Sequence, residues 1–110
     1  MNLVNRGFIQ VKPKEKLIEW AATFNAELML HQEAEGTLYL IEEDFWDDDV
    51  VLKKYSKKIA QQEFASLGFE AALWPEAFDL EAFNDWFNCK LGCTCIDLLK
   101  EPLHKEALYL

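Results

Sequence analysis

Three cysteines lie within seven positions in the last quarter of the chain: Cys89, Cys93 and Cys95. Thiolates are common ligands of structural zinc, which takes four ligands in a tetrahedron. On a strand, Cys93 and Cys95 point to the same side, and Cys89 approaches them from the end of a preceding helix. The candidates for a fourth ligand are His31, Asp97 and His104.

The same cysteines also fit a role in packing. Their spacing is not that of a zinc ribbon or knuckle, and a free cysteine is among the most buried residue types. An odd number of closely spaced cysteines is typical of reduced thiols rather than of a secreted disulfide framework. We therefore predict no cofactor, with a metal site at the three cysteines, or redox sensing by them, as the alternatives.

A second feature is the acidic segment from Glu42 to Asp49, which holds six carboxylates in eight residues. Carboxylates in this number can hold calcium or magnesium, but the segment lacks the ligand alternation and central glycine of an EF-hand loop. The alternative is a solvated loop that runs into a helix N-terminus. Phe45 and Trp46 stand inside this run, where they either anchor the loop on the core or present a recognition surface.

A third feature is the stretch from 64 to 87, which mixes seven aromatic residues with five acids. Helical spacing assigns Phe83, Trp86 and Phe87 to the core. Trp74 lies in an irregular segment, where packing explains it less well. Aromatic anchors among carboxylates suit a surface for a basic protein, because rings supply buried area and acids steer the encounter. The residues expected at that surface are Trp74, Glu70, Glu76, Phe45 and Trp46.

The parts of several common enzymes are missing. The four glycines are isolated, so no phosphate-cradling loop is present. Both serines fall inside a predicted helix, and no Gly-x-Ser-x-Gly motif occurs. A pair of carboxylates for acid–base chemistry remains open, since such pairs form in space and 20 acids are available. We therefore predict no catalytic residue, and a non-enzymatic role is favoured.

The net charge of the chain limits the classes of partner that it can bind. The net charge is −9, and residues 59–101 carry eight acids against two lysines. A negative surface disfavours nucleic acid and anionic membranes, which proteins bind through Lys and Arg. The apolar runs are short and no targeting segment is evident. These features predict one cytoplasmic domain spanning residues 1–110.

The first half of the chain predicts a strand, a helix and a hairpin. Residues 7–11 are rich in β-formers, and Pro13 then opens a helix that ends near Asn25. Its apolar residues recur at helical spacing. Residues 28–32 and 37–41 read as two strands of a hairpin, or as a helix tail followed by a single strand.

The second half predicts a long helix, a short helix and a last strand. Acids at 47–49 suit the start of a helix over about 48–67, which Gly68 ends. Asp79 caps a short helix through about Asn88. Residues 93–99 form the last strand, and the tail after Pro102 is amphipathic.

This order predicts an α+β fold. Apart from the extra short helix before the last strand, it is the βαββαβ order of a ferredoxin-like sandwich. If residues 28–32 are not a strand, the alternative is a three-stranded mixed sheet with helices on one face. Such folds host many unrelated functions, so the fold alone predicts no activity.

Three functions follow from these features. The first is a protein-binding module or regulator that docks on a basic partner. The second is a small-ligand-binding protein or enzyme with a pocket between helix and sheet, lined by His31, Tyr39, Tyr55 and Asp97. The third is a homo-oligomer that pairs through its last strand or its apolar tail.

Overall fold

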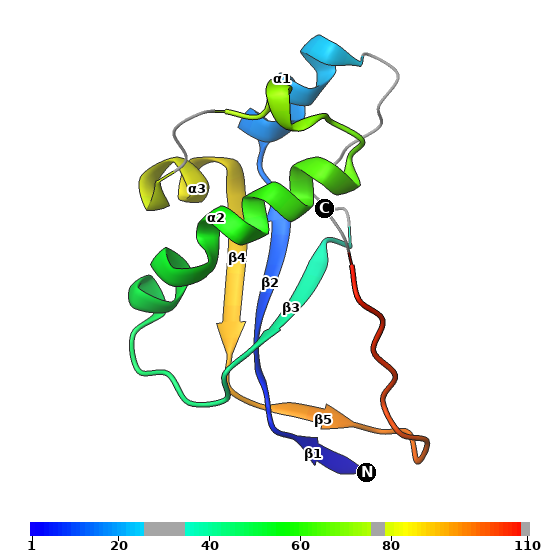
Figure 1. The fold of residues 1–110 in the computed structure, drawn as a ribbon. Helices are drawn as coiled ribbons and strands as arrows, with labels where there is room; N and C mark the ends of the chain where they lie inside the picture. Colours follow the sequence, from blue (N-terminus) through cyan, green and yellow to red (C-terminus); the bar gives the residue numbers. More distant parts are fainter. Residues whose placement is uncertain (26–34, 76–78, 109–110) are drawn as a thin grey trace.

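The computed structural model describes residues 1–25, 35–75 and 79–108. Three strands form an antiparallel sheet in the order β3–β2–β4, and β1 pairs with β5 in a separate ribbon (Figure 1). The fold is therefore α+β, as the sequence predicts. The elements are β1 (Asn2–Val4), β2 (Gly7–Pro13), α1 (Glu15–Phe24), β3 (Thr37–Ile41), α2 (Asp48–Ser66), the 3₁₀ turn η1 (Ala71–Leu73), α3 (Leu80–Trp86), β4 (Phe87–Gly92) and β5 (Cys95–Asp97).

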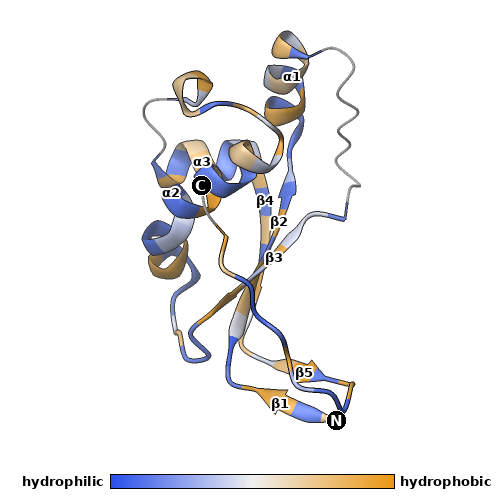
Figure 2. Ribbon diagram, turned by 45° about the vertical axis from the view of Figure 1, so that its right-hand side comes forward, coloured by the Kyte–Doolittle hydropathy of each residue, from blue (hydrophilic) through white to orange (hydrophobic). Residues whose placement is uncertain are grey.

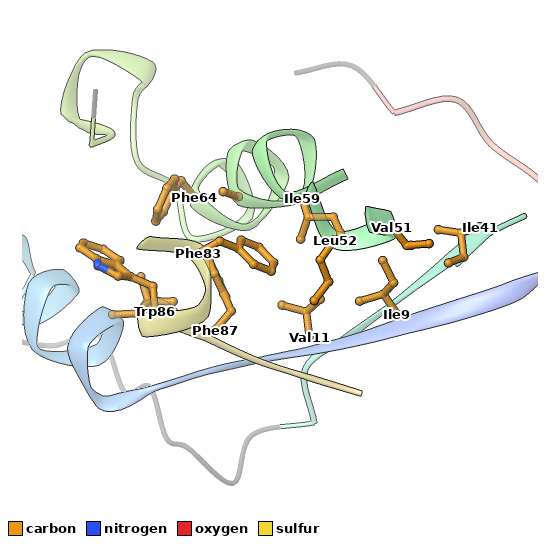
Figure 3. Close-up of a cluster of buried hydrophobic side chains, with 12 residues drawn as sticks. Ile9, Val11, Ile41, Val51, Leu52, Ile59, Phe64, Phe83, Trp86 and Phe87 are labelled. Carbon is orange, nitrogen blue, oxygen red and sulfur yellow. The ribbon is translucent and has the colours of Figure 1, made fainter. Parts of the chain in front are cut away.

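The core lies between one face of the three-stranded sheet and the helices. Successive residues of a strand point to opposite faces, and in the central strand β2 the side chains of Ile9 and Val11 are completely buried. Figure 3 shows them below α2, with Phe83 and Phe87 from the α3–β4 segment beside them. On the opposite face of the sheet, Leu38 and other side chains are exposed to solvent.

The helix ends follow the local signals in the sequence. Asp47 caps α2 by accepting hydrogen bonds from the backbone N–H groups of Asp49 and Val50, and Asp79 caps α3 through the N–H of Ala82 at 2.9 Å. Gly68 follows α2 with φ of 87°, a left-handed conformation that glycine adopts without strain. Among the described residues, no helix is both long and apolar enough to cross a membrane.

The C-terminal strand differs from its prediction. The short helix stops at Trp86, and β4 begins at Phe87, where the chain pairs with β2. The strand expected over 93–99 is wrong in its bounds, because Cys93 lies in a turn and β5 covers only 95–97. Tertiary pairing with β1 and β2, which local periodicity does not report, decides both boundaries.

Two further predictions concern the first half. The first strand, expected at 7–11, extends to Pro13, where the sequence predicted its stop. The expectation that Pro13 also opens the helix is wrong, because the N-cap of α1 is Lys14. The strand expected at 28–32 lies outside the described residues. The alternative of a mixed sheet is wrong for the strands that are described, since each pairs antiparallel with its neighbour. The ribbon of β1 and β5 was not expected at all.

Candidate partner-binding site

At the base of the loop between β3 and α2, the backbone passes close to the start of β2 and the end of β4 (Figure 1). A Cβ atom at Gly7 would lie 2.8 Å from the carbonyl oxygens of both Glu42 and Gly92, so only glycine fits there. The half-buried Phe45 ring lies against the same position and packs on the core cluster. Of the two roles expected for this aromatic pair, Phe45 takes the role of anchor.

Trp46, the other ring of this pair, lies in solvent. Its side chain is fully exposed (101%), although tryptophan is an amphipathic residue that usually buries most of its surface. Beside it is a shallow hollow of about 310 Å³, with apolar walls from Phe45, Val50 and Val51. Glu42, Asp47 and Lys54 complete its lining. The loop therefore presents a large ring and an apolar recess side by side.

Two carboxylates, those of Glu42 and Asp47, line this recess. Glu42 accepts a short hydrogen bond from the Tyr55 hydroxyl and lies 3.6 Å from the Lys54 ammonium. The Tyr55 hydrogen bond is the main cause of the lowered pKa of Glu42, so this carboxyl is ionised at neutral pH. Glu43 and Asp44 are exposed, and in the described part of the chain they form no ion pair with a lysine or arginine. Their negative charge is therefore available to a partner.

The other predicted contact residues lie elsewhere. Trp74 is half-buried, packs 6.2 Å from the Phe64 ring centroid, and donates its Nε1–H to the Phe69 carbonyl at 2.9 Å. Glu70 is exposed at the N-cap of η1, and Glu76 lies outside the described residues. Trp46 precedes the first turn of α2 and Trp74 packs on Phe64 in its last turns, so the two lie toward opposite ends of a helix about 28 Å long. The predicted contact residues thus form two groups at opposite ends of α2.

The cysteines occupy three different environments. Cys89 is half-buried in β4, where burial raises the pKa of its thiol to about 11. Cys93 is exposed in the turn before β5, and Cys95 is half-buried within that strand. All three thiols are free. No group of three or more His, Cys, Asp or Glu side chains in residues 1–25, 35–75 and 79–108 is arranged to hold a metal ion.

A groove between α2 and β3 corresponds to the pocket expected between helix and sheet. It measures about 320 Å³, and Tyr39 and Tyr55 both line it. Asp97 lies in β5 instead, where its carboxylate accepts the N–H of Leu99, and His31 is outside the described residues. The remaining lining residues are Leu40, Ile41, Lys58, Ile59, Gln62 and Leu108.

Glu63, a polar residue that the sequence analysis missed, binds the hydroxyl of Tyr39, which lines this groove. Its carboxylate accepts hydrogen bonds from the hydroxyls of Tyr39 at 2.7 Å and Thr37 at 3.0 Å. Burial raises the pKa of Glu63, and the two hydrogen bonds oppose that shift. Its position four residues after the buried Ile59 was the available signal, because residues four apart share a helix face. Val50 and Lys54, at the hollow beside Trp46, were also missed.

The chain was compared with models of protein families, with curated proteins and with solved structures, and none of them matches it. Any function must therefore be argued from the geometry of this chain alone.

Proposed function

We propose that this protein is an acidic binding module that docks on a basic protein through the loop between β3 and α2. The observation that carries this proposal is the complete exposure of Trp46 among carboxylates, next to an apolar hollow. Tryptophan is enriched among the residues that dominate binding energy at protein interfaces. A free surface gains nothing by exposing an indole ring, so a partner that covers it supplies a physical reason for its position.

The chemistry of the hollow matches a lysine or arginine side chain. The aliphatic stem of such a residue fits against Phe45, Val50 and Val51, as long basic side chains commonly lie along apolar surface. The cationic head then reaches the carboxylate of Asp47 at the rim, whereas Glu42 is already paired with Lys54. The Trp46 ring adds a cation–π contact, which strengthens when the pair is desolvated. The exposed acids nearby steer a basic partner toward the loop.

Affinity capture from the host lysate at low salt, followed by elution with increasing salt, tests this proposal. A basic protein is expected to elute at moderate salt, since charge-steered contacts are screened. Binding of the recovered partner is then measured for Trp46→Ala. We expect Kd to rise by about tenfold or more, the effect of losing an interface hot spot.

Leu38→Ala is the matched control, because Leu38 is also exposed (56%) but lies in β3, away from the loop. It should leave Kd within about twofold. Equal losses from both variants would rule out the loop as the site. Recovery of no basic partner would favour the second candidate, a small-ligand role for the groove at Tyr39 and Tyr55.

Three broader statements belong to the same proposal. The net charge of −9 supports a protein partner rather than nucleic acid or an anionic membrane. Three free cysteines support a reducing, cytoplasmic compartment. A ferredoxin-like sheet needs a fourth strand at 28–32 beside β3, and slow backbone amide exchange in those residues would support it.

A further inference from the structure

The ribbon of β1 and β5 and its flanking residues, 1–6 and 93–106 in all, are here called the terminal arm. In Figures 1 and 2 its ribbon lies at the end of the molecule farthest from α1, beyond the three-stranded sheet. Leu3 and Ile96 are directly opposite one another in the ribbon and so share one face. Six large apolar side chains of the arm are more than half exposed: Met1, Leu3, Ile96, Leu98, Leu99 and Leu103.

This arrangement is unfavourable for an isolated molecule. A two-stranded ribbon is marginally stable by itself in water and normally needs a further strand or a packing surface. The radius of gyration is 15.2 Å, whereas a compact chain of about 100 residues has one of about 13 Å. The molecule is therefore elongated, and the arm leaves apolar surface uncovered at the projecting end.

The distribution of charge along the chain indicates which kind of partner can bind the arm. Within the arm, residues 1–6 and 93–106, the basic side chains of Arg6, Lys100 and Lys105 equal the acidic ones of Asp97, Glu101 and Glu106 in number. The whole net charge of −9 is therefore carried by the rest of the chain. Two copies that meet through their bodies repel each other, whereas two copies that meet through neutral arms keep those charges apart. A basic partner, in contrast, finds no net attraction at the arm.

We propose that the terminal arm is a self-association surface, and that its occupant is the arm of a second copy of this chain. Among the described residues β1 pairs only with β5, so its outer edge is free. Two β1 strands related by a two-fold axis pair antiparallel and bring Leu3 of each copy together beside Ile96. A stable interface removes about 800 Å² from each partner, and six exposed apolar side chains supply area of that order.

The molar mass in solution tests the proposal directly. Light scattering or sedimentation of the wild-type chain should give twice 12.8 kDa at high micromolar concentration, falling toward the single-chain mass on dilution. Backbone amides of Asn2–Val4 should exchange more slowly as the concentration rises, since pairing removes them from water. A wild-type chain that stays at the single-chain mass up to millimolar concentration overturns the proposal.

Two matched substitutions locate the surface. Ile96→Lys and Leu38→Lys each place a charge on an exposed strand residue, with 54% and 56% of the native side chain exposed. Ile96→Lys should give the single-chain mass with an unchanged far-ultraviolet circular dichroism spectrum, and Leu38→Lys should leave the dimer intact. A dimer that survives Ile96→Lys, or that Leu38→Lys dissociates equally, overturns the arm as the interface.

Salt separates this inference from the proposed function. Self-association through neutral arms should strengthen as salt screens the repulsion between negative bodies, whereas binding of a basic partner at Trp46 should weaken. Self-association that weakens with salt contradicts the arm-to-arm arrangement. Loss of partner binding in Trp46→Ala, with an unchanged dimer mass, shows that the two surfaces act independently.

Discussion

Glu63 is a partly buried carboxyl group that carries a charge in a largely apolar part of the molecule. Its carboxylate lies between α2 and β3, accepts hydrogen bonds from two hydroxyls, and has a raised pKa because burial disfavours its charge. One of these hydroxyls belongs to Tyr39, and burial together with the hydrogen bond to Glu63 raises the pKa of Tyr39. Each hydroxyl that donates to the carboxylate offsets part of the cost of burying that charge.

This environment makes stability depend on pH in a defined direction. A group whose pKa is higher in the folded than in the unfolded state contributes its full stability below the unfolded pKa, about 4.3 for Glu. That contribution is lost as pH rises through the folded pKa. Glu63→Gln, which keeps an acceptor but removes the charge, should therefore raise the free energy of unfolding more at pH 7 than at about pH 4.

Urea unfolding of the wild type and Glu63→Gln across this range measures the difference. Tyr39→Phe serves as the second variant, because it removes a hydrogen bond that lowers the pKa of Glu63. It should shift the loss of stability to higher pH. A benefit of Glu63→Gln that is equal at both pH values, or larger in acid, would contradict the raised pKa.

At the scale of elements, the crossing at Gly7 links the sheet to the candidate site. The backbone of the loop after β3 and the end of β4 both approach Gly7 closely, and Phe45 rests on it. The position of the loop that presents Trp46 thus depends on a glycine at residue 7. A second glycine in β4, Gly92, leaves room for the Phe8 ring, which a Cβ would meet at 2.4 Å.

Gly7→Ala should destabilise the fold by about 1–3 kcal/mol, because the new methyl group forces two strand ends apart. Gly68→Ala is a useful comparison: a Cβ there meets nothing within 4 Å, so only its left-handed backbone is strained, at about 1 kcal/mol. Denaturant unfolding measures both. A smaller loss for Gly7→Ala than for Gly68→Ala would show that the crossing relaxes easily.

At the scale of the whole molecule, the excess of negative charge is the main electrostatic influence on stability. The described residues form two lysine–carboxylate ion pairs, Lys16–Asp85 at 4.0 Å and Lys54–Glu42 at 3.6 Å, and such solvent-exposed pairs contribute little. The net charge of −9 instead produces general repulsion in the compact state. When salt is added, the screening of this repulsion should therefore stabilise the fold more than the screening of the ion pairs destabilises it.

The free energy of unfolding should rise between about 0.01 M and 0.15 M potassium chloride, as the Debye length falls from about 30 Å to about 8 Å. Chemical denaturation at fixed pH, under dilute conditions where the chain is a single copy, measures this. The double variant Glu43→Gln/Asp44→Asn should show a weaker rise. Stability that falls with salt would mean that local ion pairs outweigh the net repulsion.

The sequence by itself determined the features that depend on neighbours along the chain. The caps at Asp47 and Asp79 and the helix end at Gly68 were predicted, because each is a local match between side chain and backbone. Helical spacing likewise predicted an apolar side for α1, on which Leu17 and Ala21 are buried, and enrichment in β-forming residues identified β2 and β3. The absence of glycine-rich and serine-based motifs and the sign of the net charge needed no structure.

The tertiary structure alone decided what depends on distant pairing and exposure. Phe87 becomes a strand residue because it pairs with Pro13, and β1 and β5 exist because they pair with each other. Phe45 and Trp46 are adjacent in sequence, yet one is packed and the other fully exposed. Composition treats the two rings alike, since burial is a property of the surroundings that the fold assembles.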